Sequence, residues 1–81
     1  MVERYKKGKG KMERVERNEL KEFRKSKKMT QTEMAQKLEI SLSHYKAIEC
    51  GFADPSFKTL TKFYEVFKGQ YDDIWKLFKK I

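Results

Sequence analysis

The sequence predicts an all-α domain of five helices that follows a flexible basic arm. Apolar residues recur at helical spacing from residue 15 onward. Residue types that favour the starts and ends of helices stand between these apolar runs. No stretch shows the sustained two-residue alternation typical of a strand. With 81 residues, the chain fits one domain and leaves no room for a second hydrophobic core.

The basic charge is concentrated in the N-terminal third of the chain. The 20 Lys and Arg and 12 Asp and Glu residues give a formal net charge of +8. Residues 1–28 hold twelve basic and five acidic residues, whereas residues 29–81 carry a net charge of only +1. Glycines among lysines and few apolar residues indicate that residues 1–13 are a flexible arm, with the folded domain at 14–81. Such a charge attracts polyanions, either nucleic acid or an anionic membrane surface.

The first two helices are predicted on either side of residue 28. Val15, Leu20 and Phe23 lie at helical spacing, and the helix should end near residues 26–28. Thr30 and Glu33 then form a capping-box pattern, in which each side chain accepts a backbone N–H of the other residue. A short second helix follows, with one apolar face made of Met34, Ala35 and Leu38.

Three more helices follow from similar signals. Ser41 is a good N-cap for the third helix, and Gly51 is placed to end it. Pro55 and Ser56 indicate the start of a fourth helix, which should end near Gly69. Its apolar face comprises Phe57, Leu60, Phe63, Tyr64 and Phe67. The fifth helix begins at Asp72 and Asp73, which suit a helix N-terminus, and carries Ile74, Trp75, Leu77, Phe78 and Ile81.

The segment from residue 29 to residue 48 predicts two short helices whose brief connection makes them cross steeply. The stretch LKEFRKSKKMTQTEMAQKLEISLSHYKAIECGFADPSFKTLTKFYEVF resembles the lambda-repressor/Cro-like helix-turn-helix family, often called XRE. The resemblance covers residues 18–78, with the helix-turn-helix unit at about 30–50. The matching residues are Thr30, Gln31, Ala35, Leu38, Ile40, Ser41, Tyr45, Ile48, Glu49, Cys50, Gly51, Pro55, Ser56, Thr59 and Leu60.

The resemblance implies a sequence-specific regulator of transcription, a small repressor that binds double-stranded DNA. Its recognition helix, at about 42–50, would enter the major groove. The residues implied to face the groove are Ser41, Leu42, Ser43, Lys46 and Ala47. Lys46 is the best base reader among them, because an ammonium can donate to O6 and N7 of guanine. Thr30 and Gln31 would hold a phosphate at the start of the preceding helix.

Two further implications concern the scaffold. Arg24 and Glu49 match positions that often form an ion pair in this family, so we expect them to join the first helix to the recognition helix. Glu39 stands where the family usually has glycine, and we expect a positive φ there.

The same fold could instead serve as a protein-interaction module of the antitoxin or adaptor type. Leu42 and Phe52, two apolar residues near the expected DNA face, favour this alternative. The net charge and the Thr30–Gln31 pair favour DNA. A cationic peptide on a membrane surface is the least favoured reading, because the apolar residues have better partners in a helical core.

Several classes of protein are disfavoured by what the sequence contains. A single cysteine, Cys50, and a single histidine, His44, permit neither an internal disulfide nor a zinc-ligand set. We see no nucleophile–base pair and no phosphate-binding glycine loop, so we expect no enzyme and no cofactor. No apolar run approaches the roughly 18–20 residues needed to span a membrane. The unpaired cysteine fits a reducing compartment, and we expect a cytoplasmic protein.

The fifth helix also predicts self-association. Its apolar residues, from Tyr71 to Ile81, occupy an arc of about 160° at 100° per residue. Docking on the domain's own core needs a stripe of only about 100° or a little more. We therefore expect Trp75 and Phe78 at an exposed edge and a symmetric homodimer that pairs through this C-terminal helix.

Overall fold

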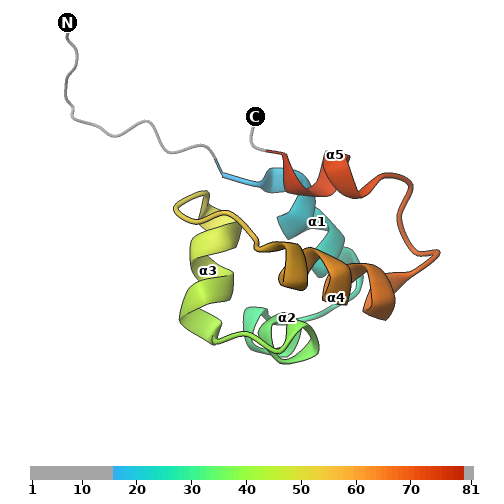
Figure 1. Ribbon diagram of the computed structural model, residues 1–81. Coiled ribbons are helices and arrows are strands. Elements are labelled where there is room, and N and C mark those ends of the chain that lie inside the picture. The colour runs from blue at the N-terminus through green and yellow to red at the C-terminus, as the bar shows by residue number, and fades with distance from the viewer. Residues whose placement is uncertain (1–15, 80–81) are drawn as a thin grey trace, which may run out of the picture.

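The computed structural model describes residues 16–79, and all regular secondary structure in this range is helical (Figure 1). The described helices are α1 (Asn18–Ser26), α2 (Gln31–Leu38), α3 (Leu42–Cys50), α4 (Phe57–Phe67) and α5 (Ile74–Phe78). The predicted all-α, five-helix fold is confirmed. The predicted arm at 1–13, together with Val15 and Ile81, lies outside the described residues.

The helices pack so that α2 and α5 lie at opposite ends of the domain (Figure 1). α2 packs against α3 and α4, and α1 packs against α5 and α3. Ten hydrophobic side chains form the core between them: Leu20, Met34, Ala35, Leu38, Tyr45, Ile48, Phe63, Phe67, Leu77 and Phe78. Every helix contributes to this one cluster, so the helix-turn-helix unit of α2 and α3 rests on a scaffold of α1, α4 and α5.

Hydroxyl and carboxylate caps start four of the helices at the expected residues. Thr30 Oγ1 accepts the Glu33 N–H at 3.0 Å, while the Glu33 carboxylate accepts the Thr30 N–H at 2.8 Å. Ser41 caps α3 and Ser56 caps α4 in the same way. Asp73 Oδ1 accepts the Trp75 N–H at 3.0 Å. Because a cap of this kind contributes typically about 1 kcal/mol, local chemistry sets these boundaries.

The turn between α2 and α3 uses a left-handed residue, as expected. Glu39 has φ 60° and ends α2, and Gly51 has φ 88° and ends α3. Lys28, in the turn between α1 and α2, also has a positive φ of 59°. A residue with a Cβ in this conformation costs roughly 1–2 kcal/mol, so Glu39 and Lys28 hold strain that glycine would not.

The fifth helix is shorter than the apolar pattern suggested, and one prediction about it is wrong. Trp75 is 69% exposed, as expected for the edge of the helix. Phe78 is only 7% exposed and does not lie at an exposed edge. Its ring packs edge-on against Phe63, with centroids 5.0 Å apart. The core aromatic cluster therefore covers one side of the wide apolar arc and leaves Trp75 outside.

Candidate nucleic-acid interface

α3 has an accessible outer face of mixed polarity and a buried inner face. Tyr45, Ile48 and Glu49 point inward and are buried. The predicted groove residues lie on the other side, where Ser41, Ser43 and Lys46 are exposed and Leu42 and Ala47 are half-buried. Helical periodicity of the buried positions fixes which side faces outward. All five residues predicted on the recognition helix are therefore at least partly accessible.

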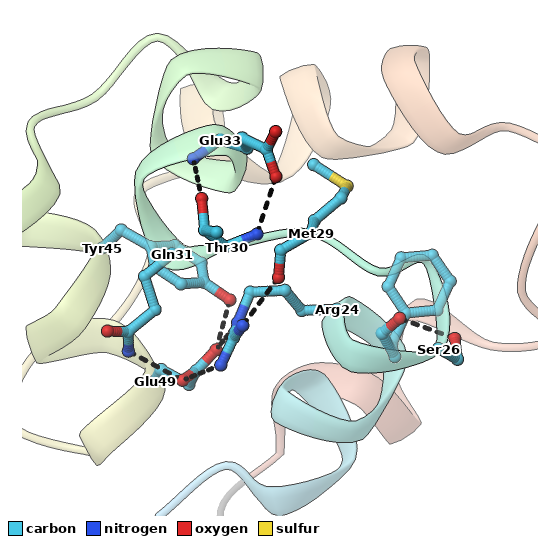
Figure 2. Close-up of polar contacts among 9 residues, drawn as sticks. Arg24, Ser26, Met29, Thr30, Gln31, Glu33, Tyr45 and Glu49 are labelled. Carbon is cyan, nitrogen blue, oxygen red and sulfur yellow. Dashed lines mark hydrogen bonds and ion pairs between the residues drawn. The ribbon is translucent and has the colours of Figure 1, made fainter.

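The start of α2 is joined to α3 by one side-chain bond. Gln31, the first residue of α2, donates from Nε2 to Oε1 of Glu49 at 2.9 Å (Figure 2). Since a carboxylate has no hydrogen to donate, the nitrogen of the Gln31 amide must be the atom that faces Glu49. Gln31 is half-buried, and Thr30 before it is exposed. The structure thus brings the predicted phosphate-binding pair alongside α3.

A buried ionic network lies directly behind Gln31. Arg24 donates from Nε to Glu49 Oε2 at 2.9 Å and from Nη2 to Oε1 at 3.2 Å (Figure 2). The Tyr45 hydroxyl donates to Glu49 Oε2 at 2.6 Å, and Arg24 Nη1 donates to the Met29 carbonyl at 2.8 Å. The expected Arg24–Glu49 pair is confirmed. It ties α1, the turn before α2 and the end of the recognition helix into one unit.

The network perturbs its ionisable groups in the directions that hydrogen bonding requires. Burial alone would raise the pKa of Glu49, but bonds from Arg24, Tyr45 and Gln31 hold that pKa below its usual value. The hydrogen bond to Glu49 raises the pKa of Arg24. Burial, together with the bond to Glu49, raises the pKa of the Tyr45 hydroxyl. The carboxylate and the guanidinium therefore stay charged, and their opposite charges offset each other beside the start of α2.

Comparison with known proteins agrees with this geometry. A family model described as helix-turn-helix matches residues 20–74. The chain belongs to the helix-turn-helix family of the lambda-repressor/Cro (XRE) type. A helix-turn-helix unit of this type is a DNA-binding motif.

A similar helix-turn-helix protein is the uncharacterized HTH-type transcriptional regulator YqaE of Bacillus subtilis (strain 168), 40% identical over 57 residues. The match covers 70% of this chain and 49% of the relative, so the chain spans about half the length of the relative.

The helix-turn-helix unit offers hydrogen-bond donors at two helix N-termini. The first N–H groups of a helix have no partner within the helix, and the helix dipole makes this end attractive to anions. The hydroxyls of Thr30 and Ser41 accept a backbone N–H, yet each keeps its own O–H for donation. Lys46 adds an exposed positive charge midway along α3. These groups are chemically suited to phosphate oxygens and base edges.

Sequence reasoning missed some polar contacts that hold this helix-turn-helix unit in place. The sequence does contain a signal for the Tyr45–Glu49 bond, because residues four apart on a helix are neighbours. It contains no such signal for the Gln31–Glu49 bond, because that bond joins two different helices. Arg17 is one of twelve basic residues in residues 1–28, and nothing in its residue type indicates that it is buried and bonded to distant parts of the chain.

The described residues contain neither a metal-binding cluster nor a membrane-spanning helix. Among residues 16–79, no group of three or more His, Cys, Asp or Glu side chains is arranged to hold a metal ion. No helix in the same range is long and apolar enough to cross a membrane.

Proposed function

We propose that this protein is a transcriptional repressor that reads a specific double-stranded DNA sequence with α3 in the major groove. The carrying observation is the accessible outer face of α3. The buried Arg24–Glu49 pair holds this helix in a fixed position (Figure 2). An α-helix fits the major groove, where each base pair displays a distinct pattern of donors and acceptors. The excess of positive charge in the chain favours binding to the phosphate backbone. Such a regulator would act in the cytoplasm.

The residues on α3 have different roles in this proposal. Lys46 donates to O6 and N7 of guanine, Ser43 bonds to base edges, and Leu42 packs on a thymine methyl group. Ser41 and Ala47 border this reading surface. Their contribution is close approach to the DNA, because neither side chain is large.

Thr30 and Gln31 grip a phosphate at the start of α2. The amide of Gln31 uses one N–H on Glu49, so its second N–H is available for a phosphate oxygen. This contact carries no sequence information but fixes the position of the protein on the duplex.

The proposal is tested by selecting binding sites from random duplexes and then measuring variants on the enriched sequence. Lys46→Ala should change the preferred base at one position, with a loss of about 1–3 kcal/mol. Gln31→Ala should weaken binding about equally on all sequences. Lys68→Ala is the matched control, because it removes an exposed lysine at the end of α4, outside both the reading face and the pairing helix. If Lys46→Ala keeps the wild-type affinity and base preference, the reading face is wrongly assigned.

A symmetric homodimer that pairs through α5 is part of the proposal. Trp75 is an exposed aromatic residue on that helix, and exposed apolar groups of this kind mark partner surfaces when they form a patch. Two half-sites about one helical turn apart require two recognition helices related by a two-fold axis. An enriched palindrome in the selection would support this symmetry.

A protein-interaction module is the second candidate, and one surface favours it. A cavity of about 550 Å³ opens between the α2–α3 turn and the start of α4. Leu38 and Ile40 line it, and Phe57, which also lines it, is 86% exposed. DNA recognition predicts that Phe57→Ser keeps its affinity for the enriched duplex. A selection that enriches no sequence at all would favour the protein-interaction function.

A further inference from the structure

Arg17 is a buried arginine whose contacts converge from distant parts of the chain. Arg17 is 3% exposed and immediately precedes α1. Nε donates to the Phe78 carbonyl at 2.7 Å. Nη1 donates to the carbonyls of Ile48, at 2.6 Å, and Ala53, at 2.9 Å. Nη2 donates to Oδ1 of Asp54 at 2.7 Å. The guanidinium is therefore bonded through all three of its nitrogens.

These partners belong to two segments that lie far apart in the sequence, residues 48–54 and the end of α5. Ile48 is near the end of α3, Ala53 and Asp54 lie in the loop that follows it, and Phe78 is the last residue of α5. In Figure 1 the loop after α3, the start of α1 and α5 lie on the same side of the domain. The main-chain N–H of Arg17 also donates to the Glu49 carbonyl at 3.0 Å. Arg17 thus bonds the end of α5 to the end of the recognition helix.

The chemistry of these contacts favours a geometric role. Most of the acceptors are carbonyls at or beside the C-terminal ends of two helices, where the helix dipole is negative and stabilises a cation. The carboxylate partner, Asp54, has a side chain that is 75% exposed, so water screens that ion pair. A guanidinium directs its N–H groups in a rigid plane, whereas a lysine ammonium is a compact charge on a flexible stem. Arginine at this position therefore fixes the relative orientation of the start of α1, residues 48–54 and the end of α5. A positive charge without directed N–H groups would not.

We propose that Arg17 is a positioning residue that couples the pairing helix α5 to the recognition helix α3. This role rests on the proposed function, in which two copies pair through α5 and place two α3 helices on one duplex. A rigid joint between α5 and α3 sets the separation and rotation of the two recognition helices. Arg17 thereby determines which spacing between half-sites the protein accepts, although it touches neither DNA nor the second copy.

The test compares the enriched palindrome with a duplex that has one base pair added between its half-sites. The insertion turns one half-site by about 34° relative to the other, since a helical turn holds 10–10.5 base pairs. Wild type should prefer the original spacing by about tenfold or more if its frame is rigid. In Arg17→Lys this preference should fall to about threefold or less. A merely structural role would lower the affinity for both duplexes by the same factor.

Two control variants separate coupling from stability. Ser56→Ala removes the side-chain cap of α4, which lowers stability without removing any bond of Arg17, and it should keep the wild-type spacing preference. Asp54→Asn removes the charge of the exposed partner and should also keep it. If Arg17→Lys keeps the preference as well, Arg17 has no role in spacing.

Hydrogen exchange of wild type provides a measurement that does not depend on a variant folding. The Ala53 N–H donates to the Ala47 carbonyl, and the Lys79 N–H donates to the Trp75 carbonyl of α5. A duplex with one half-site should slow exchange at both amides if Arg17 couples them. Slowing at Ala53 alone would overturn the coupling. A protein that binds no selected duplex would overturn the proposed function and this role together, whereas an unchanged spacing preference in Arg17→Lys overturns only the role of Arg17.

Discussion

Replacing Glu49 by glutamine should strongly destabilise the domain, because this carboxylate is the centre of the buried network. Its side chain is 4% exposed, and that of Arg24 is 10% exposed. Glu49 accepts two bonds from Arg24, one from Tyr45 and one from Gln31. An amide keeps one acceptor oxygen but removes the negative charge and turns an NH₂ group toward donors. The guanidinium of Arg24 then stays buried without a counter-charge.

Breaking a buried ion pair by removing one partner typically costs about 3–5 kcal/mol. In a domain of this size, each kcal/mol lowers Tm by roughly 4–8 °C. We therefore expect Glu49→Gln to lower Tm by about 12–40 °C. Because native domains are stable by only about 5–15 kcal/mol in total, the variant should be close to its unfolding midpoint at moderate temperature.

Thermal and urea denaturation followed by far-ultraviolet circular dichroism measures this loss. Tyr45→Phe is the matched control, because it removes one of the four bonds to Glu49 and leaves both charges in place. It should cost about 1.5–3 kcal/mol, the range for a hydrogen bond to a charged group. If Glu49→Gln costs no more than Tyr45→Phe, the ion pair does not stabilise the junction between α1 and α3.

The same network predicts how stability depends on pH. The folded state holds the pKa of Glu49 below its ordinary value, so folding favours the charged form. Its stabilisation is fully present above the ordinary glutamate pKa of about 4.3 and is lost as pH falls through the lower, folded pKa. The difference in unfolding free energy between wild type and Glu49→Gln should therefore shrink below about pH 4. A difference that stays constant down to strongly acidic pH would contradict the assignment.

Three further predictions concern the arm, the α2–α3 turn and the pairing helix. Deleting residues 1–12 should reduce the log–log salt dependence of DNA affinity by about 0.9 per lost phosphate contact; an unchanged slope would show that the arm makes none. Glu39→Gly should raise the unfolding free energy by up to about 1 kcal/mol, because it relieves a φ of 60° and loses only a partly exposed ion pair with Lys62. Glu39→Ala is its control, and a destabilised Glu39→Gly variant in urea denaturation would refute the strain. Trp75→Ala should weaken self-association in sedimentation experiments, with Tyr64→Ala as a control; a wild type that stays monomeric at high concentration and binds a palindrome without cooperativity would contradict pairing through α5.

The sequence by itself determined the helices and most of the accessible face of the recognition helix. Thr30, Ser41 and Ser56 cap helices with their own nearby backbone, so a few neighbouring residues contain the whole interaction. The outer positions of α3 were implied by the family resemblance, and the repeat of 3.6 residues per turn keeps them away from the buried Tyr45 and Ile48.

Only the tertiary structure decided which polar side chains hold the helices together. Arg17 bonds carbonyls 31 to 61 residues away in the chain. Every residue type has a backbone carbonyl, so the sequence does not indicate which carbonyls accept these bonds. The Gln31–Glu49 bond spans 18 residues and exists only because α2 and α3 pack together. The width of the apolar arc on α5 indicated that part of this face would stay outside the core, but it did not indicate which residues. In the structure Phe78 packs in the aromatic core and Trp75 is exposed. Burial depends on the shape of the space between helices rather than on the hydrophobicity of any one residue.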